Sequence, residues 1–106
     1  MENKSVLKID SFGVKRWKLN GKFHREDGPA IEYPNGDKFW YYNGFHHRMD
    51  GPAVTQHGID YWLIYDHDIT EKITKWAEEL GIDLDNLTEV DKALIKIVWA
   101  DYDEEI

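Results

Sequence analysis

The sequence WKLNGKFHREDGPA, residues 17–30, returns 23 residues later as WYYNGFHHRMDGPA, residues 40–53. The two copies share the tryptophan, the Asn-Gly pair, the His-Arg pair and the Asp-Gly-Pro-Ala block in the same places. A glycine also stands four residues before each tryptophan, so that Gly58 and Trp62 begin a third, truncated copy, which loses the pattern after Trp62. A fixed period of this length is typical of a repeat architecture.

Turn signals inside the repeat predict antiparallel hairpins. The Asn-Gly pairs at residues 20–21 and 43–44 suit type I′ turns, because both central positions of such a turn need a positive φ. A second turn is expected at residues 34–37, between strands at residues 30–33 and 38–42. Two hairpins per repeat make a meander of antiparallel strands.

The tryptophans and the Asp-Gly-Pro blocks have different expected places in this meander. One tryptophan per repeat is expected to stack into an aromatic spine in the core of the β layer, formed by Trp17, Trp40 and Trp62. The Asp-Gly-Pro blocks at residues 27–29 and 50–52 are expected to form corners, since proline starts a strand without needing a backbone donor.

The composition changes after residue 65, where a helix is predicted. Asp68 or Thr70 is expected to cap this helix, and Gly81 is expected to end it. Its apolar face follows the helical period and consists of Ile73, Trp76, Ala77 and Leu80.

A second helix is predicted from a capping box of Thr88 and Asp91, and it is expected to run to about Tyr102. One apolar stripe consists of Val90, Leu94, Ile97 and Val98, and a neighbouring apolar face consists of Ile95, Trp99 and Tyr102. Because one stripe is enough to dock on a sheet, the helix is interpreted either as a terminal cap buried on both sides or as a surface for a homodimer or another partner.

These patterns predict one α+β domain over residues 1–106. An antiparallel β-meander of about two and a half hairpin repeats, residues 1–66, is expected to be capped by two C-terminal helices in an acidic helical hairpin, residues 67–106. No segment approaches the roughly 20 apolar residues that span a bilayer, and the N-terminus lacks a signal-peptide run. The chain is therefore expected to be cytoplasmic and to bind no membrane.

The charge is concentrated in the C-terminal part of the chain. The net charge is −8; residues 1–69 carry 9 basic against 10 acidic side chains, and residues 70–106 carry 4 against 11. Such a tail repels a phosphate backbone, so direct nucleic-acid binding is not expected. It suits a basic partner, including one whose surface normally holds nucleic acid.

The His-Arg-x-Asp blocks at residues 24–27 and 47–50 resemble acid–base or phosphate-binding clusters. A catalytic site is normally built once per chain, so we interpret the blocks as structural. Their aspartates would accept backbone or arginine hydrogen bonds at the corners, and their histidines would pack beside the tryptophans. The alternative is a small-ligand site for a nucleotide, lined by repeat aromatics and by Arg25, Arg48, His24 and His47.

No enzymatic or metal site is predicted. The chain has no cysteine, and the adjacent His46 and His47 would point to opposite faces of a strand. Ser5 and Ser11 lie in no glycine-flanked elbow, and no phosphate-binding glycine pattern is present. Neither a catalytic residue nor a cofactor is therefore expected.

The combination of W-x-x-N-G, H-R-x-D-G-P-A and G-x-x-x-W over residues 13–62 resembles a repeat of bacteriophage, large-virus and some bacterial or protist proteins. This repeat is loosely akin to MORN-variant and WG β-hairpin repeats. The resemblance implies an interaction module in which the His-Arg-x-Asp residues are scaffold. The third unit departs from the pattern, because Tyr65 and Asp66 stand where Asn-Gly is expected.

The function expected from these features is that of a non-enzymatic protein-binding module. It would be a small phage-type viral inhibitor or modulator of a host or defence protein, acting in the cytoplasm of the host cell through its acidic helical surface. The residues expected to contact the partner are Glu78, Glu79, Ile95, Trp99, Asp101, Tyr102 and Asp103.

Overall fold

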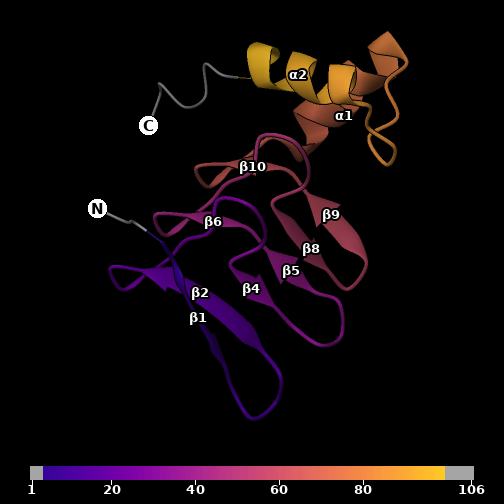
Figure 1. Ribbon diagram of the computed structural model, residues 1–106. Helices are drawn as coiled ribbons and strands as arrows, with labels where there is room; N and C mark the ends of the chain where they lie inside the picture. Colours follow the sequence, from indigo (N-terminus) through magenta and orange to yellow (C-terminus); the bar gives the residue numbers. More distant parts are fainter. Residues whose placement is uncertain (1–3, 100–106) are drawn as a thin grey trace.

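Three antiparallel hairpins lie side by side in one seven-stranded sheet of the computed structural model, which describes residues 4–99 (Figure 1). The sheet order is β1-β2-β4-β5-β8-β9, with β3 paired to the far end of β2. The strands are β1 (Val6–Ile9), β2 (Lys15–Leu19), β3 (Lys22–Phe23), β4 (Ile31–Glu32), β5 (Lys38–Phe39), β8 (Val54–Gln56) and β9 (Ile59–Tyr61). The predicted meander is confirmed.

A smaller hairpin follows each hairpin of the large sheet. β2 continues into β3, β6 (Tyr41–Tyr42) pairs with β7 (Phe45–His46), and β10 (Leu63–Ile64) pairs with β11 (His67–Asp68). The first two turn at Asn-Gly, with φ of 53° at Asn20 and 51° at Asn43. In the third, Tyr65 and Asp66 take the same left-handed conformation, with φ of 47° and 69°. The third repeat therefore keeps its second hairpin, although its sequence departs from the repeat pattern after Trp62.

The strand predicted at residues 38–42 is divided at Trp40. The Trp40 N–H donates to Ala53 O at 2.6 Å, whereas its carbonyl accepts from His47 N at 3.1 Å. Trp40 therefore connects the large sheet to the small hairpin, and the segments on either side of it belong to different sheets.

The expected tryptophan spine is replaced by a column of other rings. Trp17 and Trp40 each stack against an arginine of their own repeat. The rings that connect successive repeats are His24, Tyr42, His47 and Tyr65, with consecutive centroids 4.6, 5.9 and 4.0 Å apart. Histidine and tyrosine thus take the place that the sequence pattern assigned to tryptophan.

Two helices lie at one end of the row of repeats, beside β10 and opposite the β1–β2 turn (Figure 1). α1 (Thr70–Leu80) ends at Gly81, whose φ of 72° is left-handed, as predicted. α2 (Glu89–Val98) begins with the predicted capping box, in which Thr88 accepts from Asp91 N and Asp91 accepts from Thr88 N. α2 ends at Val98, and Tyr102, where it was predicted to end, lies outside the described residues.

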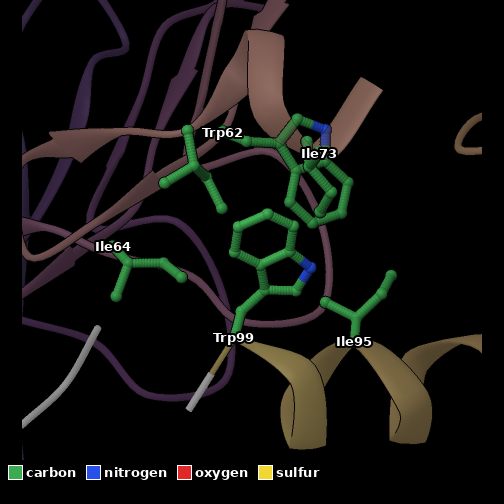
Figure 2. Close-up of a cluster of buried hydrophobic side chains, with 6 residues drawn as sticks. Trp62, Ile64, Ile73, Ile95 and Trp99 are labelled. Carbon is green, nitrogen blue, oxygen red and sulfur yellow. The ribbon is translucent and has the colours of Figure 1, made fainter. Parts of the chain in front are cut away.

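The largest cluster of buried apolar side chains joins the third repeat to both helices. Figure 2 shows how the side chains of α1, α2 and the third repeat converge. The buried members are Trp62, Ile64, Ile69, Ile73, Ile95 and Trp99. The helical cap on the repeats is therefore confirmed. The interpretation that α2 is buried on both sides is corrected, because Val90 and Ile97 are 76% and 74% exposed.

Candidate functional site

Each His-Arg-x-Asp-Gly-Pro-Ala block holds its arginine in a fixed position. The Arg25 guanidinium lies over the Trp17 ring, with Cζ 3.8 Å from the ring centroid. Its Nε donates to Asp27 Oδ1 and one terminal nitrogen donates to Pro29 O, both at 3.1 Å. A planar cation against an aromatic face, bonded along its edge, is favourable in energy and specific in geometry.

The second block repeats this arrangement. Arg48 Cζ lies 3.9 Å from the Trp40 ring centroid, Nε donates to Asp50 at 3.0 Å, and a terminal nitrogen donates to Pro52 O at 3.1 Å. The expectation that the aspartates hold the corners through arginine hydrogen bonds is confirmed in both repeats.

The glycine of each block leaves the space in which the arginine lies. A Cβ on Gly28 would lie 2.7 Å from Arg25 Cζ, and a Cβ on Gly51 would lie closer still to Arg48 Cζ. Neither glycine has a positive φ, so backbone strain does not explain its presence. The guanidinium is enclosed between an indole ring on one side and a glycine on the other.

The histidine and arginine also bind the next repeat. His24 is 3% exposed, and its Nδ1 accepts from the backbone N–H of Asn43, in the next turn, at 3.0 Å. His47 Nδ1 accepts from Tyr65 N at 3.2 Å in the same way. The backbone N–H of Arg25 donates to the backbone carbonyl of Tyr41 at 3.1 Å. The histidine rings lie against tyrosines, and each histidine also lines the same cleft as the tryptophan of its repeat.

The third repeat has Ile69 and Thr70 where the first two repeats have the histidine and the arginine. Ile69 N–H donates to Trp62 O at 2.8 Å, which is the bond that His24 and His47 make to their tryptophans, so Ile69 occupies the histidine position. It is 1% exposed and packs in the cluster of Figure 2. Thr70 occupies the arginine position, and its hydroxyl accepts from Trp62 N at 2.8 Å. The sequence reasoning did not recognise these replacements, although the spacing of seven residues from Trp62 could have shown them.

Two clefts border the arginines that were considered for a nucleotide. One, of about 530 Å³, is lined by Trp17, His24 and Arg25, and another, of about 250 Å³, is lined by residues that include Arg48 and Lys96. Carboxylates line the same clefts, namely Glu26, Asp27 and Asp50. An anionic ligand would therefore compete with hydrogen bonds that the arginines already make, and the nucleotide alternative stays a prediction.

The residues predicted to contact a partner fall into three groups. Glu78 and Glu79 are exposed on α1. Ile95 and Trp99 are only 1% and 8% exposed, so they anchor the cap and cannot contact a partner while the cluster is intact. The remaining predicted residues lie outside the described part of the chain: Asp101, Tyr102 and Asp103.

The exposed apolar residues of α2 form the stripe that the sequence analysis placed next to Ile95. We call these residues the α2 outer face: Val90, Leu94, Ile97 and Val98, which are 76%, 37%, 74% and 41% exposed. Their spacing of four, three and one residues places them on one side of the helix. The sequence spacing identified this stripe. It did not predict that the stripe is exposed, because each of the two apolar stripes of α2 is apolar enough to be buried.

The loop between the helices carries the acidic residues Asp83 and Asp85. The pKa of Asp83 is lowered because the side chain of Asn86 donates to it, and the backbone N–H of Asp85 also donates to it. In the first turn of α2, Glu89 faces solvent and contacts Lys92 at 3.4 Å. The loop and the first turn of α2 are thus acidic, whereas the last turn of the helix carries Lys96.

Comparisons with protein-family models, with curated proteins and with solved structures found no match. Among residues 4–99, no helix has the length and apolar character needed to cross a membrane. Over the same range, no group of three or more histidine and acidic side chains is placed to hold a metal ion.

Proposed function

We propose that this chain is a non-enzymatic protein-binding module that binds a partner through the α2 outer face. The observation that carries the proposal is the exposure of four large aliphatic side chains on one short helix, while the opposite side of the same helix is buried in the cap. A patch of this kind on a small protein is typical of an interaction surface. Burial of Val90, Leu94, Ile97 and Val98 would complete the packing of the helix on both sides.

The charge around the patch defines the partner's chemistry. The two helices and their loop, residues 70–99, carry seven acidic against four basic side chains. A partner with an apolar groove and a basic rim would match both the aliphatic side chains and this charge. Long-range attraction would also increase its rate of association.

The biological role that we propose is inhibition or modulation of a host or defence protein. The support for this role is the resemblance of the repeats to those of phage and large-virus proteins, together with an acidic surface suited to a basic protein site. The structural use of both His-Arg-x-Asp blocks favours binding over catalysis, since their side chains are already bonded within the scaffold.

The test is capture of partners from a host lysate by the intact chain and two variants. Val90→Glu with Ile97→Glu places charge on the α2 outer face at highly exposed positions, so the fold should be retained. Phe12→Glu is the matched control, because Phe12 is 83% exposed in the β1–β2 turn, at the opposite end of the molecule. Circular dichroism would check folding.

The proposal predicts a protein that is captured by the wild type and by Phe12→Glu but lost with the α2 double variant. Reversal of charge by Glu78→Lys with Glu79→Lys should weaken the same complex, and added salt should weaken it further. Equal capture by the wild type and the α2 variant would exclude this face. A nucleotide that co-purifies in place of a protein would instead favour the ligand alternative.

A further inference from the structure

The hairpins of the large sheet are joined by the same pairing at each junction. β2 pairs with β4, with Arg16 opposite Ile31, and β5 pairs with β8, with Phe39 opposite Val54. In both cases the second strand of one hairpin pairs with the first strand of the next. The sheet is thus a row of equivalent hairpins, each of which offers an edge to its successor.

This row ends in two edges to which no described strand is paired. β1 is paired only with β2, and β9 is paired only with β8. All seven residues of these two strands are exposed. β9 holds the place that β2 and β5 hold at the internal junctions, whereas β1 holds the place of β4 and β8. The two ends are therefore complementary to each other.

The direction of the backbone groups at these edges follows from the hydrogen bonds of the neighbouring strands. Tyr61 O accepts from Ala53 N, so the Tyr61 backbone faces β8. Because direction alternates along a strand, the N–H and C=O of Asp60 face outward. On β2, the backbone N–H of Trp17 donates to Ala30 O and so faces away from β1. By the same alternation, the backbone groups of Arg16 face β1, and those of its partner Lys8 face β2. Ile9 then faces outward on β1.

We propose that β9 of one copy pairs with β1 of a second copy, which would extend the sheet from molecule to molecule. By analogy with the internal junctions, Asp60 would exchange two backbone hydrogen bonds with Ile9 of the second copy. Tyr61 would lie opposite Lys8 of the second copy, on the face shared by Phe39 and Val54. The contact is head-to-tail, so each added copy leaves the same two edges free.

The charges at the two ends of the sheet favour pairing with a second copy of the chain. The described part of the chain up to residue 22 carries six basic side chains and one acidic side chain, namely Lys4, Lys8, Lys15, Arg16, Lys18, Lys22 and Asp10. β9 and the hairpin that follows it carry Asp60, Asp66 and Asp68. The two ends of the row therefore attract each other. The contact is short, because Trp62 N–H already bonds to Thr70, and we expect weak association that increases with protein concentration.

The register can be tested by disulfide formation, since the chain has no cysteine of its own. Tyr61→Cys protein is mixed with Lys8→Cys protein under mild oxidation. The control mixture contains Tyr61→Cys with Val6→Cys, which lies on the same face as Lys8 but two residues away. Directly opposed residues meet the geometry of a disulfide, so the first mixture should form heterodimers roughly tenfold faster than the control. Equal rates would overturn the proposed register.

The edge itself can be tested by sedimentation velocity over a range of protein concentrations. The average mass should rise without a plateau at the dimer. Asp60→Pro removes the outward N–H, so it should abolish the rise, whereas Asp60→Ala keeps this N–H and should not. A monomer at every concentration would overturn the proposal. So would association that persists in Asp60→Pro but is lost in Val90→Glu with Ile97→Glu, because that result would place the interface on α2. If Asp60→Pro fails to fold, the cysteine rates decide.

Discussion

At the scale of single residues, the repeat is held by an arginine enclosed between a tryptophan and a glycine. Arg25 contacts Trp17, Asp27 and the carbonyl of Pro29, and Gly28 leaves the space that the guanidinium fills. These contacts give a physical reason for the repeated tryptophan, arginine, aspartate and glycine. Trp17, Asp27 and Gly28 are therefore coupled, because all three border the guanidinium of Arg25.

This arrangement predicts a specific coupling between Gly28 and Arg25. Gly28→Ala should destabilise the protein by about 1–3 kcal/mol, because the new methyl group displaces the guanidinium from the indole. The same substitution should cost much less in an Arg25→Ala background, in which the space is vacant. Urea denaturation of the four proteins in this cycle measures the coupling. Equal costs in both backgrounds would contradict the proposed contact.

At the scale of elements, the transition from repeats to helices depends on two exchanged side chains. The histidines at position seven after tryptophan accept a bond from the next turn, whereas Ile69 has apolar neighbours from the helices. In the earlier repeats the backbone N–H of the tryptophan donates to the carbonyl of Ala30 or Ala53. In the third repeat the hydroxyl of Thr70 is the acceptor instead. In the last repeat the backbone N–H of Trp62 therefore finds its acceptor only eight residues away, in Thr70, which is also the first residue of α1.

This role predicts different effects for two substitutions at the start of α1. Thr70→Val has nearly the same shape but no acceptor, so the Trp62 N–H loses its partner and stability should fall by about 1–3 kcal/mol. Thr70→Ser keeps the hydroxyl and should cost less. Thermal unfolding followed by circular dichroism compares the two. A loss for serine as large as that for valine would indicate that the methyl group, and not the hydrogen bond, is important.

At the scale of the whole molecule, the cap and the third repeat share one core. Residues from β10, α1 and α2 meet in the cluster of Figure 2, and Trp76 and Trp99 contact edge to face with centroids 6.0 Å apart. Loss of the helices would expose Trp62 and Ile64, which are 4% and 1% exposed in the intact fold. We therefore expect the repeats and the cap to unfold together.

Ile95→Ala tests this cooperativity. The substitution leaves a cavity at a residue that is 1% exposed, so it should destabilise the protein by about 2–5 kcal/mol. Hydrogen exchange should become faster at Trp62 and Ile69 in the third repeat as well as along α2. Ile97→Ala is the matched control, since Ile97 lies on the same helix but is 74% exposed, and it should change neither quantity appreciably. Faster exchange confined to α2 would show that the cap unfolds independently.

The amino-acid sequence by itself determined the features that depend on neighbouring residues. The Asn-Gly turns, the left-handed Gly81 and the Thr88–Asp91 capping box are local, because a few adjacent side chains satisfy or constrain the backbone. The repeat period fixed the meander in the same way, and it predicted that the aspartates of the His-Arg-x-Asp blocks bond at the corners. The spacing of the apolar residues in α2 also predicted its apolar stripe.

Only the tertiary structure decided which partner each side chain meets. The histidines bond to the turn of the following repeat, 18 or 19 residues away, and the strand at Trp40 divides because its two backbone groups bond in different directions. Two apolar stripes of α2 were compatible with burial, and the cluster around Trp62 accepts Ile95 and Trp99. The other stripe is left exposed, because a single helix face fills the space above the third repeat. Local pattern cannot decide such a choice, since it depends on the shape that the rest of the chain presents.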